Sequence, residues 1–293
     1  MHSHHYIVAG HVFTISLPEA EEGIELTSYI PFKVNAIPHA FSPLFTLVID
    51  DTFYPTAKGE TIGDFDCGAA DFGVYRLPDG SYQMLISPPG GQYCGLLQAN
   101  SDFSQGTIAT RGQDSLRTFA VNNALMLMYA FASATKGTLL IHSSVIKNDG
   151  YGYLFLGQSG TGKSTHSNLW LKHIEGSELL NDDNPVIVVD NEGATVYGSP
   201  WSGKTPCYKN DSARIGAFVR IQQKPENRIM REQPLQAFAT LLPSMSTMKW
   251  DRRVYDGVCD SVSRLVATVP LFTLGCRPDQ EAAEVCHAEI TKR

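Results

Sequence analysis

A glycine-rich octapeptide in the middle of the chain has the residue types and spacing of a phosphate-binding loop. Gly157 begins the pattern G-x-x-x-x-G-K-S, and Gly162, Lys163 and Ser164 close it. Glycines let the backbone curl so that successive N–H groups point into one concavity, which binds an anion. A lysine at this position reaches the β- and γ-phosphates of a nucleotide, and the serine hydroxyl contacts Mg²⁺. We therefore predict a Walker A site for ATP and Mg²⁺, formed by Gly157, Ser159, Gly160, Thr161, Gly162, Lys163, Ser164 and Thr165.

Two consecutive aspartates follow this loop. The segment between the loop and the aspartates is long enough for only one helix and one turn. Asp182 and Asp183 stand at the end of a short apolar run, flanked by Asn181 and Asn184. One carboxylate can hold Mg²⁺, and the other can take the proton of an attacking hydroxyl. A polar turn is the alternative interpretation, because Asp and Asn favour turns. Beside a phosphate loop we favour the catalytic interpretation.

Four weaker candidates could complete the site. His142 lies on the strand expected before the loop, where hairpin geometry would bring it near the phosphates, although a lone strand histidine is more often structural. Segment 198–206 contains two glycines and two prolines that fix its shape, with Trp201 and Lys204 as candidate substrate contacts. A surface turn is the alternative for this segment. Arg231 could stabilise charge in a transition state.

The pattern around these residues predicts the elements that would position them. Residues 153–156 are an apolar run typical of a buried strand, and a helical pattern continues after the loop to about Glu175, with Gly176 as its stop. Residues 139–146 are expected to form one strand that pairs with 153–156. Further strands are expected near 178–180, 186–189, 194–197, 217–221 and 228–231, and helices near 235–242, 252–266 and 279–290.

The first part of the chain is expected to be rich in β-structure and to end at a long helix. Residues 74–77 and 82–86 flank Pro78-Asp79-Gly80, which is a clear hairpin turn signal. From Asp114 to about Ala134 apolar residues recur at helical spacing. We therefore predict an α/β (α+β) protein with a β-rich region at 1–112 and a nucleotide-binding region at 113–293.

Composition and charge exclude several classes of partner. A net charge of −7 provides no electrostatic attraction to nucleic acid or to anionic membrane. No apolar stretch approaches the roughly 20 residues that a transmembrane helix needs, and the first residues lack the apolar segment of a signal peptide. We expect a cytoplasmic protein that binds a nucleotide and an acceptor and could act as a homo-oligomer.

These motifs together resemble the superfamily of HPr kinase/phosphorylase and phosphoenolpyruvate carboxykinase. The stretch GQSGTGKSTHS resembles its phosphate loop, His142 resembles the active-site histidine of HPr kinase, and LLNDD resembles its paired-aspartate segment. The resemblance covers 138–189 well and the rest of the C-terminal part loosely. It implies a C-terminal P-loop domain of this type, with Asp182 as base and Asp183 as metal ligand, although the two roles could be exchanged.

The chain departs from HPr kinase where that family carries its later signature, because GSPWSGKTPCYKN stands there. Residues 1–112 match no family in the same way. An acceptor other than HPr is therefore expected: a protein, a peptide or a small molecule. We expect an ATP-dependent kinase in which Asp182, His142 and Lys163 are catalytic. The alternatives are an ATP-binding regulatory module without transfer, and phosphorolysis or carboxykinase-like chemistry.

Overall fold

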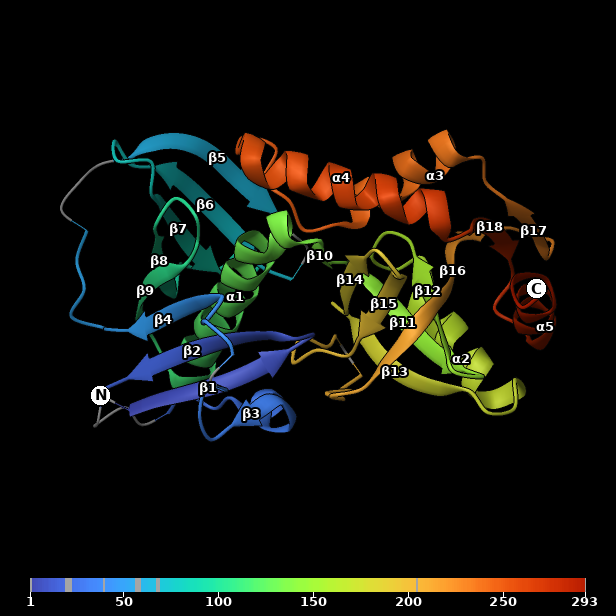
Figure 1. Cartoon of the computed structure of the whole chain (residues 1–293), viewed down its shortest axis with the longest axis horizontal. Helices are drawn as coiled ribbons and strands as arrows, with labels where there is room; N and C mark the ends of the chain where they lie inside the picture. Colours follow the sequence, from blue (N-terminus) through green and yellow to red (C-terminus); the bar gives the residue numbers. More distant parts are fainter. Residues whose placement is uncertain are drawn as a thin grey trace. The chain divides into compact units, whose positions relative to one another are not determined.

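The computed structural model describes residues 2–18, 23–38, 40–55, 59–66, 69–203 and 205–292. It has the mixed α/β class expected from the sequence, and its strands form two large β-sheets (Figure 1). The chain divides into two compact units, Met1–Ser133 and Ala134–Arg293.

In its described residues, the first unit is a sheet with one long helix packed on one face (Figure 1). The helix α1 spans Asp114–Ser133, as the sequence predicted. Among the described residues the sheet has nine strands in the order β3-β1-β2-β4-β9-β8-β7-β6-β5. Its strands are β1 (His2–Val8), β2 (His11–Leu17), β3 (Lys33–Val34), β4 (Phe45–Ile49), β5 (Glu60–Asp66), β6 (Asp71–Arg76), β7 (Tyr82–Ser87), β8 (Gly95–Ala99) and β9 (Gln105–Thr110).

Helix α1 belongs to the first unit because it packs against β4, β7, β8 and β9. Two strand glycines allow this close approach. A Cβ at Gly95 would lie 2.7 Å from Cβ of Ala120, and one at Gly106 would lie 2.9 Å from Cε of Met128. The boundary predicted at 112/113 assigned this helix to the second part of the chain, whereas in the structure the two units meet after Ser133.

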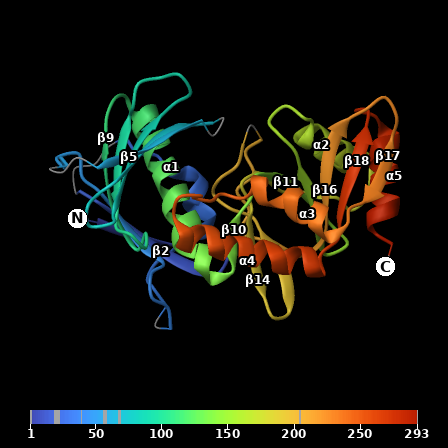
Figure 2. The ribbon, with the colours of Figure 1, turned by 90° about the horizontal axis from the view of Figure 1, so that it is seen from above.

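The second unit is a mixed sheet with helices on both faces (Figures 1 and 2). The strand order is β10-β14-β15-β16-β12-β11-β13, and β18 joins β16 to β17. Strands β12, β16 and β18 are parallel, so their carboxyl ends lie at one edge. The strands are β10 (Thr138–Leu140), β11 (Ser143–Asn148), β12 (Tyr151–Leu156), β13 (Glu178–Asp183), β14 (Val186–Asp190), β15 (Gly193–Tyr197), β16 (Ser212–Gln223), β17 (Arg228–Arg231) and β18 (Leu271–Cys276).

Two pairs of helices cover this sheet. Helices α2 and α5 pack together over β11, β12 and β18, where Phe155, Trp170 and Val219 belong to one buried cluster. Helices α3 and α4 pack together, and α4 lies against β10, β14 and β15. The helices are α2 (Lys163–His173), α3 (Pro234–Leu241), α4 (Arg252–Thr268) and α5 (Gln280–Ile290).

One sequence-based expectation for this sheet was wrong. Residues 139–146 do not form one strand but divide into β10 and β11. The chain changes partner at this point: β10 pairs with β14, whereas β11 pairs with β12 and β13. Between them Ile141 bridges to Met245, and the N–H of His142 donates to the carbonyl of Ser244 at 2.8 Å. His142 therefore lies in a break between two strands and not within one.

Candidate functional site

The glycine loop, Gly157–Ser164, connects the buried strand β12 to the start of α2. Gly157, Gly160 and Gly162 have φ values of 152°, 82° and 104°, which L side chains rarely adopt. Gly162 occupies the N-cap position of α2 without a side-chain cap, so the first N–H groups of the helix are left for another acceptor. Residues 158–160 are exposed. Strand, loop and helix follow in the order that the sequence predicted.

Buried contacts hold helix α2, which follows this loop, against the rest of the unit. Trp170 is fully buried and donates through Nε1 to Nε2 of His166 at 3.1 Å. Burial lowers the pKa of His166 to about 4, so the ring is neutral near pH 7. Ser167 shares a 2.6 Å hydrogen bond with Ser144 of β11. These contacts fix the position of Lys163 and Ser164 at the other end of the same helix.

Lys163 lies inside the curl of the loop. Its Nζ donates to the carbonyl oxygens of Gly157 at 2.9 Å and Gln158 at 3.4 Å, and it lies 2.8 Å from Nε2 of His142. Burial lowers the pKa of Lys163, while the carboxylates of Asp183 and Asp182 oppose that shift. The lysine is therefore a partly desolvated cation held at the loop.

His142 connects this lysine to the second aspartate. Its Nδ1 lies 3.0 Å from Oδ1 of Asp183, and the other oxygen of Asp183 accepts from Nδ2 of Asn184 at 2.7 Å. An ammonium can only donate, so Nε2 of His142 accepts from Lys163 and the ring proton lies on Nδ1, toward Asp183. Lys163, His142 and Asp183 thus form one hydrogen-bonded chain.

The side chain of Asp182 has different surroundings from that of Asp183, because neighbouring residues of a strand point to opposite faces of the sheet. It pairs across the sheet with Ser144, on the α2 side, whereas Asp183 pairs with Ser143. Oδ1 of Asp182 accepts from the hydroxyl of Ser164 at 2.9 Å, and the residue is only 5% exposed. The two carboxylates are adjacent in sequence but serve two different parts of the site.

The oxygen atoms of Ser164 and Asp182 suit Mg²⁺, a hard cation that binds oxygen ligands. Within the described ranges, no group of three or more His, Cys, Asp or Glu side chains is arranged to hold a metal by itself. A Mg²⁺ that accompanies a nucleotide needs no such group, because phosphate oxygens and water supply most of its ligands. The residues present therefore fit Mg²⁺ held together with a nucleotide, through Ser164 and one aspartate.

Segment 198–203 lies directly against the two aspartates. Ser202 bridges to Asp183, and the N–H of Gly203 donates to the carbonyl of Asp182 at 2.7 Å. Trp201, predicted as a substrate contact, is 2% exposed, so its indole is buried and not presented to an acceptor. Lys204 lies outside the described residues.

Arg231 is not brought to this site. It ends β17, which pairs only with β18 among the described strands, and its Cα partner is Phe272. Strands β18 and β16 separate it from β12 and the glycine loop.

Sequence reasoning missed three residues that support the aspartates: Asn181, Asn184 and Ser199. From the sequence, Asn181 was identified only as a residue that flanks the aspartates, yet it is fully buried. Its position between an apolar run and two aspartates is a signal that could have indicated an internal hydrogen-bonding role, because buried amides need partners.

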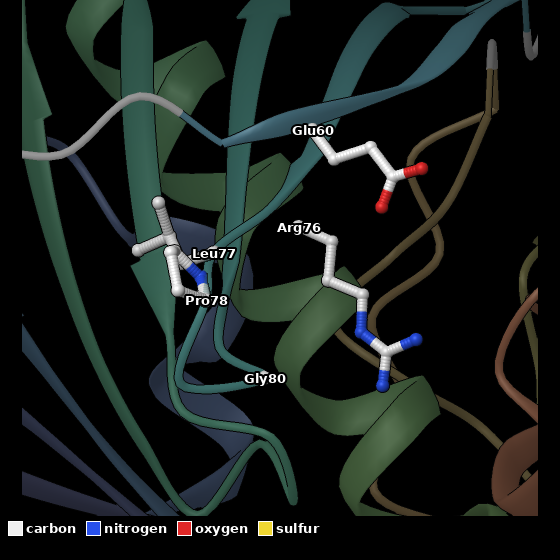
Figure 3. Close-up of a pocket in the computed structure, with 5 residues that line it drawn as sticks. All are labelled: Glu60, Arg76, Leu77, Pro78 and Gly80. Atoms are coloured by element: carbon white, nitrogen blue, oxygen red, sulfur yellow. The ribbon is translucent and has the colours of Figure 1, made fainter.

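A separate hollow of about 410 Å³ lies in the first unit (Figure 3). It is lined by Glu60, Arg76, Leu77, Pro78 and Gly80, at β5 and the β6–β7 turn. None of the predicted site residues lines it.

No model of a known protein family and no curated protein matches this chain. Across the described residues, no helix is long and apolar enough to cross a membrane.

Proposed function

We propose that the second unit is a Mg²⁺-ATP-dependent phosphotransferase, of the HPr kinase and phosphoenolpyruvate carboxykinase type, that phosphorylates a hydroxyl group. The acceptor is a protein, a peptide or a small molecule other than HPr. The observation that carries this proposal is the pair of contacts beside the glycine loop: Ser164 with Asp182, and Lys163 with His142 and Asp183. A loop that only bound a nucleotide would not need a second carboxylate tied to a histidine.

The contacts favour one of the two assignments that the sequence left open. Asp182 is buried and bonded to Ser164, so together these two residues would hold Mg²⁺. The side chain of Asp183 is 26% exposed and bonded to His142, so Asp183 is the better candidate for the base. This exchanges the roles that the family resemblance implied for the two aspartates.

The proposed reaction divides between these residues. Asp183 accepts the proton of the acceptor hydroxyl as its oxygen bonds to the γ-phosphorus and the bond to the β-phosphate oxygen breaks, which releases ADP. His142 orients Asp183 through Nδ1–H, and Lys163 and the loop N–H groups hold the transferred phosphoryl group. Bound Mg²⁺ would neutralise phosphate charge. Most of the rate enhancement then comes from positioning and charge stabilisation.

A two-stage experiment tests this proposal. Thermal shift with Mg²⁺-ATP measures nucleotide binding to the unmodified chain and to the Lys163→Ala variant. We expect Mg²⁺-ATP to stabilise the unmodified chain only. Incubation with γ-labelled ATP and an extract of the source cells then measures transfer, and we expect a labelled product that Asp183→Asn does not form. If the chain binds Mg²⁺-ATP but labels nothing beyond the Asp183→Asn background, it is a nucleotide-binding module and the proposal is wrong.

A further inference from the structure

Asn181 is a fully buried amide that uses both ends of its side chain beside the two aspartates. Its Oδ1 accepts from the backbone N–H of Asp183 at 3.1 Å. Its Nδ2 donates to Oγ of Ser199 and to the carbonyl of Trp201, both at 3.2 Å. One side chain therefore joins the strand that carries the aspartates to the segment that lies beside it.

Ser199 extends this connection to the residue that follows the aspartates. Its hydroxyl donates to the carbonyl of Asn184 at 2.6 Å and accepts from the N–H of Trp201 at 3.1 Å. Ser199 is fully buried, like Asn181. Because each bond is shielded from water, loss of one partner leaves a polar atom unsatisfied.

The segment held in this way, Ser199–Gly203, covers the outer edge of β13 beside the aspartates. Strand β13 ends the sheet on this side among the described strands, so its edge groups need other partners. The bridge from Ser202 to Asp183 and the bond from Gly203 to Asp182 provide them. A Cβ at Gly203 would lie 2.7 Å from the carbonyl oxygen of Asp182, so this approach requires glycine.

A bulge in β13 directs Asn181 toward this segment. Val145 of β11 pairs with Asn181, but the next residue, Ile146, pairs with Leu179, so Leu180 is the extra residue. An extra residue reverses which face the following side chains occupy. The bulge therefore sets the orientation of Asn181 and of both aspartates after it.

We infer that Asn181 is a positioning residue for the Asp182–Asp183 pair, acting through the Asp183 backbone and through segment Ser199–Gly203. This inference rests on the proposed function for its catalytic meaning. Asparagine is required because the position must accept one hydrogen bond and donate two, which neither aspartate nor leucine of similar size can do. Asn181 is fully buried, so the role inferred for it does not depend on contact with the nucleotide.

The test uses Asn181→Ala and the near-isosteric Asn181→Asp in the full chain. We expect ATP affinity in EDTA to stay within about twofold of the unmodified chain. The gain in affinity on adding Mg²⁺ should fall by about 10-fold or more, as is typical when the support of a metal ligand is removed. Amide hydrogen exchange at Asp183 and Gly203 should accelerate, while exchange in β16 stays unchanged.

Asn148→Ala is the matched control. Asn148 is a buried amide of the same unit that donates to the carbonyl of Glu175 at 2.8 Å and to Ser177 at 3.3 Å, after α2. The Asn148→Ala variant should be less stable, but its gain in ATP affinity on adding Mg²⁺ (the Mg²⁺ effect) should equal that of the unmodified chain. Equal Mg²⁺ effects and equal exchange at Asp183 and Gly203 in the Asn181 and Asn148 variants would overturn the inference.

The milder variant Ser199→Ala tests the same positioning role if the Asn181 variants do not fold. It should accelerate exchange at Gly203 and reduce the Mg²⁺ effect, and unchanged values of both would also overturn the inference. Exchange requires neither ATP nor an acceptor, so it tests the positioning role even if the chain transfers no phosphate. Absence of labelled product in the unmodified chain, with the exchange result as expected, would reject the proposed function alone.

Discussion

Nε2 of His142 lies 2.8 Å from Nζ of Lys163, the single cation of the glycine loop. The lysine is also bonded to the loop carbonyls of Gly157 and Gln158, so its charge is satisfied within the protein. A phosphate group that accepted hydrogen bonds from Lys163 in place of His142 would release Nε2 of His142. Asp183 would still orient the ring through Nδ1. If the loop binds phosphate, His142 would connect that binding to Asp183, the proposed base.

His142→Ala tests that connection. Without the ring, Asp183 loses its charge-assisted partner, and transfer should fall by about 100-fold. Affinity for Mg²⁺-ATP should change much less, because the loop N–H groups and Lys163 remain. The two quantities are measured by labelled-product formation and by calorimetric titration. Equal losses in both would show that His142 serves nucleotide binding alone.

The two aspartates should respond differently to the same change. Asp182→Asn removes a charge beside Ser164 and should weaken Mg²⁺-dependent ATP binding by about 10-fold or more. Asp183→Asn should leave that binding nearly intact but reduce transfer by about 100-fold to 10,000-fold. Titration with and without Mg²⁺, followed by the transfer assay, separates the two effects. The reverse pattern would restore Asp182 as the base.

Buried His166 should make stability depend on pH. Its pKa in the folded state is lowered to about 4, from an ordinary value near 6.5 in the unfolded chain. Between these values the unfolded state binds more protons, so stability falls as the pH drops from 6.5 toward 4, by up to about 3 kcal/mol from this group. Denaturant unfolding at several pH values measures the effect, and His166→Gln should show a shallower dependence. Parallel curves for the two chains would contradict this.

Trp170 should be the main anchor of α2. Trp170 is fully buried, and the centroid of its ring lies 5.4 Å from the ring centroid of Tyr153 and 5.3 Å from that of His287. Trp170→Ala should therefore cost about 3–5 kcal/mol of unfolding free energy. Leu171→Ala is the control on the next residue of the same helix; Leu171 is 39% exposed, and its loss should cost less than about 1 kcal/mol. Similar losses for both variants would show that the cluster around Trp170 does not secure the helix.

Much of the fold could be predicted from local patterns. The hairpin at Pro78-Asp79-Gly80 is present, with Gly80 at a φ of 83°, because this turn depends on adjacent residues. Helix α1 and the sequence β12–loop–α2 were also predicted, since each has a strong periodic or glycine signal. The break at His142 could not be predicted, because it depends on Ser244 and Met245, about 100 residues later in the chain.

The proximity of the candidate site residues was predicted in part. The sequence analysis predicted that the glycine loop, His142 and the two aspartates lie close together. In the structure, Lys163 and Ser164 of the loop are hydrogen-bonded to His142 and Asp182, and His142 contacts Asp183. It did not indicate that Trp201 would be buried or that Asn181 would face Ser199. The orientation of Asn181 depends on the bulge at Leu180, which shifts strand register and has no signal in residue type.

The most direct test of the account is the transfer of label from γ-labelled ATP in an extract of the source cells with Mg²⁺. The unmodified chain should produce a labelled acceptor, and Asp183→Asn should produce none while still binding Mg²⁺-ATP. Identical labelling patterns from the two chains, at equal nucleotide binding, would contradict the assignment of this site to phosphoryl transfer.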